Sequence, residues 1–338
     1  MANSTGKKNV IGPSALRPHG AFDVVGLGES MLSLSRDPET AGFSSDIAGA
    51  ESNVARNCAA LGLRSSWISR LGTGVAGPLV HDVIAGEGVD TSNVNFSEDA
   101  PTGVMLKGPP AMQPRVQYYR RFSAASQMSP RNVDIPTCLD TIVLHLTGIT
   151  LALSESCREL MIRLLDEPAS ALRSFDLNWR PALWPSPIPG EFLADMANRA
   201  DIVFVGLDEA EAVWGLSTPT DVRAMLNRPR YLVVKNGANG VHTFVDGTDR
   251  FEPALRGTVI DPIGAGDAFA AGFLYGIVKH PDDLQRCSRL GHIVAMSAVS
   301  SPNDVGQVPD WSAIGQMLSM GEREWASLIY PGPSLPSG

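Results

Sequence analysis

Hydrophobic positions along the chain follow two alternating patterns. Short β-branched apolar runs predict buried strands, and the segments between them carry apolar residues on one helical face, as Val54, Cys58 and Leu61 do after Gly49. This alternation indicates an α/β fold in which a mostly parallel central sheet is covered by helices on both faces. We expect strands at 21–27, 67–72, 141–149, 174–178, 201–206, 231–237 and 241–245, and further helices at 80–90, 154–166, 209–214 and 264–278.

Two segments, 30–48 and 101–122, break this rhythm. In the second, strict alternation places Tyr118, Arg120 and Phe122 on one face of a strand. We interpret both segments as a small β-rich lid that projects from the main sheet.

The chain ends are predicted to be flexible tails, at 1–20 and 331–338. The first has no continuous apolar stretch of the kind found in a secretion signal, and the second is rich in Pro, Gly and Ser. Between them no internal repeat or linker divides the sequence, so we expect a single domain over 21–330. No run in the sequence approaches the roughly 18 apolar residues that a membrane helix needs.

Composition narrows the classes of function. The net charge of −9 argues against a nucleic-acid-binding protein, which would normally present a basic face. The four cysteines form no Cys-x-x-Cys pair, as expected for reduced thiols in a cytoplasmic protein. The six histidines show no metal-binding spacing, which argues against a transition-metal site.

The strongest chemical signal is the segment DPIGAGD at 261–267, which runs directly into a helical pattern. Gly264 and Gly266 would let backbone N–H groups approach a phosphate, where the helix N-terminus adds partial positive charge. Asp267, in the first turn, could take the proton from an attacking hydroxyl while those amides stabilise the transferring phosphoryl group. The alternative is an aspartate that only caps the helix, with glycines for close packing.

This motif, GAGDAFAAGF with Asp261 in front, resembles the C-terminal signature of the ribokinase-like (PfkB) carbohydrate kinases. The segment 49–53 is similar to the family's N-terminal sugar-binding glycine motif, and VVKNGANGV at 233–241 is similar to its nucleotide loop. Asp208-Glu209 resembles the end of its Asn-x-x-Glu metal motif. The motifs occur in the family's order over about residues 21–315.

Within that family, PTGVML, YYRRFSAAS and FDLNWRPALW resemble segments of 2-keto-3-deoxygluconate kinases. Arg120 shares a predicted strand face with Tyr118, and Arg180 follows another strand at the sheet edge where α/β proteins bind ligands. Two arginines that converge on a pocket would suit a carboxylate, which a guanidinium binds in bidentate fashion. The alternative for both arginines is solvent exposure, with stacking on Tyr119 or Trp179.

The resemblance implies a ribokinase-like three-layer sandwich that uses ATP and Mg²⁺ and forms a homo-oligomer, a dimer through the lid, with no nucleic-acid or membrane partner. The implied catalytic residues are Asp267, as general base, with Gly264, Ala265 and Gly266. The implied binding residues are Gly49, Asn53, Tyr118, Arg120 and Arg180 for the substrate, Lys235, Gly237, Ala238 and Gly240 for ATP, and Glu209 and Asp176 for Mg²⁺, mostly through water. The loop at 237–240 also suits a tight hairpin.

Four positions depart from the family's pattern. Ser33 stands where fructokinase-like and ribokinase-like members usually have an aspartate that binds sugar hydroxyls, which argues against a plain fructose or ribose kinase. Met105 stands where keto-deoxygluconate kinases often have a tyrosine, so one hydrogen bond to the ligand is lost. Ala48 replaces the first glycine of the sugar motif. Gly206 replaces the asparagine of the metal motif, so we expect the metal network to depend more on water and Glu209.

Other functions remain open at this stage. A fructokinase, ribokinase or nucleoside kinase of the same family is the nearest alternative, and a non-catalytic sugar sensor could share the fold. Gly26 and Gly28 follow a strand as in a dinucleotide-binding oxidoreductase, but Met31 occupies the position of the third glycine. No P-loop motif occurs. We therefore expect an ATP-dependent kinase acting on 2-keto-3-deoxygluconate or a related sugar acid.

Overall fold

The computed structural model describes residues 20–37, 40, 42–108, 116–184 and 186–332. The predicted tails at 1–19 and 333–338, and lid residues 38–39, 41 and 109–115, lie outside the described residues. In the described part, nine strands form the main sheet in the order β13-β12-β11-β10-β9-β8-β1-β4-β5. These strands are β1 (Phe22–Leu27), β4 (Ser65–Gly72), β5 (Val94–Ser97), β8 (Thr141–Thr147), β9 (Leu172–Asp176), β10 (Ile202–Gly206), β11 (Tyr231–Lys235), β12 (Gly240–Val245) and β13 (Thr248–Pro253).

The main sheet is parallel from β5 to β11, and β12 and β13 add antiparallel strands at one edge. The parallel strands are buried on both faces and read as continuous apolar runs, such as Ile202–Gly206. Their carboxyl ends meet at a single edge, where an open α/β sheet binds its ligands.

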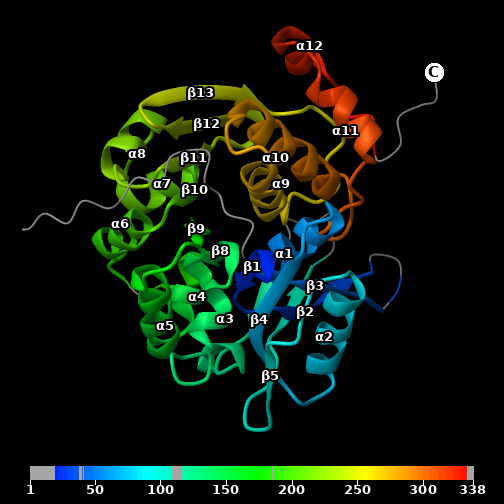
Figure 1. Ribbon diagram of the computed structural model, residues 1–338. Coiled ribbons are helices and arrows are strands. Elements are labelled where there is room, and N and C mark those ends of the chain that lie inside the picture. Colours follow the sequence, from blue (N-terminus) through cyan, green and yellow to red (C-terminus); the bar gives the residue numbers. More distant parts are fainter. Residues whose placement is uncertain (1–19, 38–39, 41, 109–115, 185, 333–338) are drawn as a thin grey trace, which may run out of the picture.

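Helices cover both faces of this sheet (Figure 1). One face packs against α1 (Ala50–Ala60), α9 (Ala265–Lys279) and α10 (Leu284–Val299). The opposite layer contains α3 (Ile135–Leu139), α4 (Gly148–Leu153), α5 (Glu155–Asp166), α6 (Gly190–Arg199), α7 (Leu207–Trp214) and α8 (Pro219–Met225). α2 (Ala76–Gly86) packs against β4, and α11 (Trp311–Leu318) and α12 (Glu322–Ser327) follow α10. The predicted three-layer α/β sandwich is confirmed.

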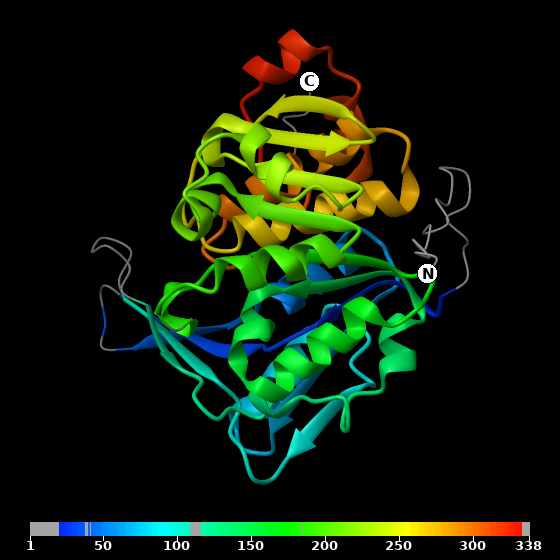
Figure 2. The same cartoon turned by 90° about the vertical axis from the view of Figure 1, so that its left-hand side faces the viewer.

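The predicted lid is a second sheet, which Figure 2 shows beside the main body. Its order is β3-β2-β6-β7, formed by β2 (Met31–Arg36), β3 (Phe43–Ala48), β6 (Val104–Lys107) and β7 (Val116–Tyr119). The predicted strand alternation through Phe122 was wrong, because β7 ends at Tyr119 and the chain turns where Ser123 N–H donates to the Arg120 carbonyl. Phe122 has a φ of +60° and is 72% exposed.

Several elements escaped sequence reasoning. α10 is the longest of them, and it is buried on nearly all sides, so no single apolar face marks it. Its contact with α9 is close, since a Cβ on Gly272 would lie 2.4 Å from the Leu290 carbonyl oxygen. The predicted strand at 174–178 ends at Asp176, because Asn178 has a φ of +40°. Among the described residues, no helix has the length and apolar character needed to span a membrane.

Candidate active site

A cavity of about 1020 Å³ lies between the lid and the carboxyl ends of the main-sheet strands. Its walls include Lys235 at the end of β11, the start of α9, and Met105 and Tyr118 from the lid. All predicted site residues except Asp176 line this one cavity. Motifs separated by more than 200 positions in the sequence therefore meet in one place.

Asp267 lies in the first turn of α9, and Gly264 begins that helix with a φ of +83°, a conformation that favours glycine. Two amides hold the buried carboxylate: Asn53 Nδ2 donates to Oδ2 at 3.1 Å, and Asn178 Nδ2 donates to Oδ1 at 3.2 Å. Burial raises the pKa of Asp267 to about 7, against the lowering effect of the Asn53 hydrogen bond. The carboxylate can therefore exchange a proton near neutral pH.

Asn178 reaches Asp267 because the chain turns sharply after β9. Asparagine tolerates the left-handed conformation that this turn requires better than most residues do. Glu209 fixes the turn, since its Oε1 accepts the Trp179 N–H at 2.8 Å while its Oε2 accepts the Gly206 N–H at 2.7 Å. Burial raises the pKa of Glu209. Its predicted role with Mg²⁺ stays a prediction.

Lys235 places a cation beside the start of α9. Its Nζ lies 2.7 Å from Asp176 Oδ2, and a Cβ on Gly266 would stand 3.4 Å from the same nitrogen. Burial opposes the charge, but Asp176 and Glu209 hold the pKa of Lys235 above its usual value. Asp176 thus lies behind the lysine and outside the cavity wall, which explains why it alone is missing from the lining.

The two predicted arginines differ in their partners. Arg120 forms an ion pair with the buried carboxylate of Glu29, which also accepts a hydrogen bond from Ser123. Arg180 Nη1 donates only to the backbone carbonyl of Trp179, at 3.1 Å, among the contacts within the described residues. Arg180 is exposed, as the alternative interpretation proposed, whereas Arg120 is largely buried. Neither stacks on the ring named there, since Arg120 contacts the Tyr118 ring and Trp179 stacks on Trp184.

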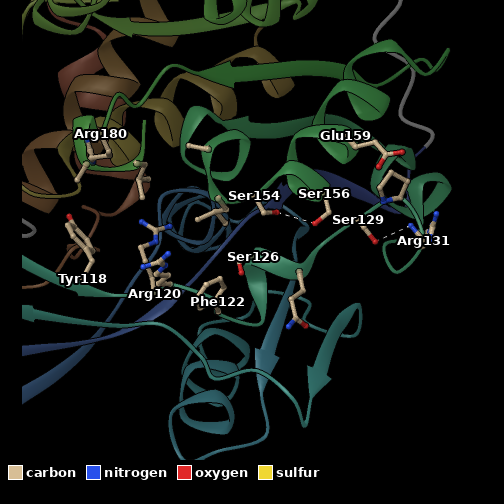
Figure 3. A pocket seen from close by; sticks show the side chains of 17 residues that line it. Tyr118, Arg120, Phe122, Ser126, Ser129, Arg131, Ser154, Ser156, Glu159 and Arg180 are labelled. Atoms are coloured by element: carbon tan, nitrogen blue, oxygen red, sulfur yellow. Dashed lines mark hydrogen bonds between the residues drawn. The ribbon is translucent and has the colours of Figure 1, made fainter. Parts of the chain in front are cut away.

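Both arginines and Tyr118 separate the main cavity from a second one of about 960 Å³. Figure 3 shows these three side chains on one side of the second cavity, with Arg131 and Glu159 on the other. The substrate end of the site is therefore bounded by three side chains that also line a second, partly basic cavity.

The predicted nucleotide loop is a short 3-10 turn, Gly237–Asn239, between β11 and β12. Gly237 and Gly240 have φ values of +51° and +136°, in the region that favours glycine. The hairpin interpretation is confirmed, and the loop also lines the cavity. Its role in ATP binding stays a prediction.

Two of the lid positions that depart from the family pattern, Met105 and Ser33, lie in different places relative to the cavity. Met105 is buried and lines the cavity, whereas Ser33 pairs with Asp46 across β2 and β3 and lies outside the lining. Sequence reasoning missed Glu29 as the partner of Arg120, and it missed the ion pair of Lys107 with Asp304. No spacing in the sequence marks these pairs, because each joins distant segments.

Fold and site together define a sugar kinase of ribokinase-like architecture. The chain belongs to the pfkB family of carbohydrate kinases, whose family model matches residues 22–311. Its resemblance to that family is thereby confirmed, and the oxidoreductase alternative is set aside.

One curated relative and two solved structures are similar to this chain over most of its length. The chain is 33% identical over 318 residues to a 2-dehydro-3-deoxygluconokinase of Bacillus subtilis (strain 168), covering 88% of this chain and 96% of that protein. The crystal structure of a PfkB protein from Polaromonas sp. JS666 matches with a TM-score of 0.76 and 33% identity, covering 84% of this chain and 98% of that one. A fructokinase with bound ATP from Xylella fastidiosa matches with a TM-score of 0.76 and 23% identity, covering 88% and 99%, and supports the fold alone.

Proposed function

We propose that this sugar kinase transfers the γ-phosphoryl group of ATP to a hydroxyl of 2-keto-3-deoxygluconate, the substrate named for its Bacillus relative as 2-dehydro-3-deoxygluconate. The observation that carries the proposal is Asp267, a buried carboxylate at a helix N-terminus with a pKa raised to about 7. A base with this pKa can accept a hydroxyl proton at neutral pH. The ATP held by the structurally similar Xylella fastidiosa fructokinase supports the choice of donor.

In the proposed reaction, Asn53 and Asn178 hold the ionised Asp267 toward the cavity. As the sugar oxygen bonds to the γ-phosphorus, its proton passes to Asp267 and the bond to the leaving oxygen breaks, which releases ADP. The N–H groups at the start of α9 and the Lys235 ammonium stabilise the charge on the transferring group. The glycine loop at 237–240 holds the nucleotide.

Mg²⁺ would neutralise phosphate charge in this transfer when bound. Glu209 would contact the ion through water, because its oxygens already accept hydrogen bonds from backbone N–H groups. Asp176 lies behind Lys235, so it would reach the ion only through that lysine or through water. Within the described ranges, no group of three or more His, Cys, Asp or Glu side chains could cage a metal directly. The donor set therefore suits an ion that keeps most of its waters and is held mainly by the phosphates.

The substrate's carboxylate is assigned to Arg180, whose guanidinium lines the cavity without a carboxylate partner in the described part of the chain. A second candidate substrate is a neutral sugar such as fructose. The Glu29–Arg120 pair favours it, because this pair cancels one of the two positive charges that the sugar-acid hypothesis used.

A coupled ADP-release assay tests the proposal with a panel of 2-keto-3-deoxygluconate, its galacto epimer, fructose, ribose and adenosine. We expect the highest kcat/KM for a keto-deoxy sugar acid. If fructose is the best substrate and no sugar acid reacts, the substrate assignment is wrong while the kinase assignment stands. If no acceptor on the panel stimulates ADP release, the proposed activity itself fails.

We also propose that the protein forms a dimer through the lid. Exposed aromatic side chains lie on both edge strands of the lid and just beyond it, at Phe43, Tyr119 and Phe122. Such side chains suit burial against a second copy, as in a dimer through the lid. Light scattering coupled to size exclusion, with Phe122→Ser as the test variant, measures the oligomeric state.

Residues 21–330 would act as one domain. The four free, buried cysteines fit a cytoplasmic location.

A further inference from the structure

Lys107 ends β6 of the lid, and its side chain is only 7% exposed. Its Nζ lies 2.7 Å from Asp304 Oδ1 and 3.7 Å from Asp261 Oδ2. Burial opposes the charge, but Asp304 and Asp261 hold the pKa of Lys107 above its usual value. A lid cation is thus buried between two carboxylates of the main body, outside the contacts used above for catalysis.

Both carboxylates belong to segments that shape the start of α9. Asp261 opens the glycine motif, and its Oδ1 accepts the Ile263 N–H at 3.0 Å. Asp304 packs directly against the helix cap, since a Cβ on Gly264 would lie 2.7 Å from the Asp304 carbonyl oxygen. Any shift of Asp304 would therefore move the glycine whose left-handed conformation begins the helix.

The lid reaches the same segment a second time. Asp46 on β3 accepts the Asp304 N–H at 3.3 Å and lies 3.9 Å from Arg56. Arg56 in turn donates to Asn53 Oδ1 at 3.3 Å, and Asn53 donates to Asp267. These contacts connect the lid sheet to the proposed base as well as to the anion-binding turn.

Charge explains why a lysine is needed at this point. Asp46, Asp261 and Asp304 gather within one small region, and a transferring phosphoryl group would add further negative charge beside them. Lys107 neutralises part of this charge from the lid side. Without it, the carboxylates would repel one another and the phosphate, and the buried Asp304 carboxylate would lose its partner at a cost in stability.

We infer that Lys107 is a positioning residue for phosphoryl transfer, which fixes the glycine turn at the start of α9 through Asp261 and Asp304 and so makes that turn dependent on the lid. This inference rests on the proposed function, in which the turn receives the phosphoryl group. Lys107 does not touch the reacting atoms. It should therefore affect kcat, through the geometry of the turn, more than it affects the binding of either substrate.

Lys107→Met tests the inference, with kcat and both KM values measured in the ADP-release assay. We expect kcat to fall about tenfold or more, the scale of a misplaced catalytic group, while each KM changes less than about threefold. Lys107→Arg keeps the cation and should recover most of kcat. Asp304→Asn should lower kcat on its own and add little to Lys107→Met, since both changes remove one interaction.

Arg173→Met is the matched control. Arg173 is also a buried cation, but it lies near the start of β9, where it donates to the backbone carbonyls of Leu164 and Ala171. This variant should lose thermal stability and keep its kcat at a permissive temperature. The inference is overturned if Lys107→Met keeps wild-type kcat, if Arg173→Met lowers kcat equally, or if Lys107 and Asp304 effects are fully additive. An inactive wild-type protein would instead refute the proposed function.

Discussion

The two ends of the cavity hold their charged groups in opposite ways. At the phosphate end, the Asp267 carboxylate is held by two neutral amides, from Asn53 and Asn178, so it stays available as a base. At the substrate end, the Arg120 guanidinium is already paired with a carboxylate, Glu29. One end is thus arranged to leave its charge reactive, and the other neutralises half of the positive charge that it offers.

This difference separates the general chemistry from the choice of substrate. A base held by neutral donors suits any hydroxyl that reaches it, so the phosphate end can serve every kinase of this fold. The substrate end depends on how many cations remain free, and here Arg180 is the one cation of the pair without a carboxylate contact in the residues described. The predictions below test each end in turn.

Removal of the base should have the largest effect. We expect Asp267→Asn to lower kcat by at least about 10²-fold, the lower range for loss of a general base, while ATP binding stays nearly unchanged. The asparagine keeps the size of the side chain but cannot take the hydroxyl proton. Single-turnover kinetics measure the chemical step, and ATP titration by calorimetry provides the control. A variant that keeps most of its turnover would show that Asp267 only caps α9.

The substrate end should respond next in size. Arg180→Ala should raise KM for 2-keto-3-deoxygluconate about ten- to a hundred-fold, because a charged hydrogen bond is worth roughly 1.5–3 kcal/mol. KM for ATP should hardly move. Arg120→Ala is the matched comparison: it leaves Glu29 buried without its partner, so we expect a loss of thermal stability as well as weaker substrate binding. Equal effects of both changes on KM and on stability would remove the distinction between the two arginines.

The pH profile tests the phosphate end without a mutation. Burial raises the pKa of Asp267 to about 7, and only the ionised form can accept the proton. Activity should therefore rise with pH and level off above 7, and kcat/KM should fall about tenfold for each pH unit below it. The carboxylate of the sugar acid is ionised throughout this range, so it does not contribute. The residual activity of Asp267→Asn should show no break near pH 7, and a wild-type break near pH 4 would contradict the assigned base.

The phosphate end was predictable from sequence because its residues are local. Gly264, Gly266 and Asp267 lie within one turn, and helix physics alone gives them a role. The main-sheet strands were predictable for a similar reason, since continuous apolar runs mark buried strands. The prediction placed Arg120 and Arg180 at the cavity but treated both as free, because nothing near Arg120 in the sequence indicates Glu29.

The elements that escaped prediction depend on distant contacts. α10 is buried against α9 and the sheet, and its buried positions include polar residues such as Arg289 and His292. These polar residues interrupt the helical periodicity of apolar residues by which a helix is predicted from sequence. Asp176 is predicted to bind Mg²⁺ through water because it ends a strand at the site, but its carboxylate pairs with the Lys235 side chain from β11 and does not line the cavity. A strand end fixes where a residue lies along the sheet, but it does not fix which side chain reaches it from another strand, here from β11 across β10.

The smallest predicted effect would test the comparison most directly. Glu29→Gln keeps the size of the side chain and an acceptor for Ser123, but it removes the charge that neutralises Arg120. The freed guanidinium should then attract an anionic substrate, so KM for the sugar acid should fall about two- to fivefold, the scale of about 0.5–1 kcal/mol for a solvent-accessible ion pair. Thermal stability should fall as it does for Arg120→Ala, since the same buried pair is broken. Fructose carries no charge, and its KM should stay within error. A lower KM for fructose too would point to a change in pocket shape, and an unchanged KM for the sugar acid would mean that Arg120 serves only to hold the lid.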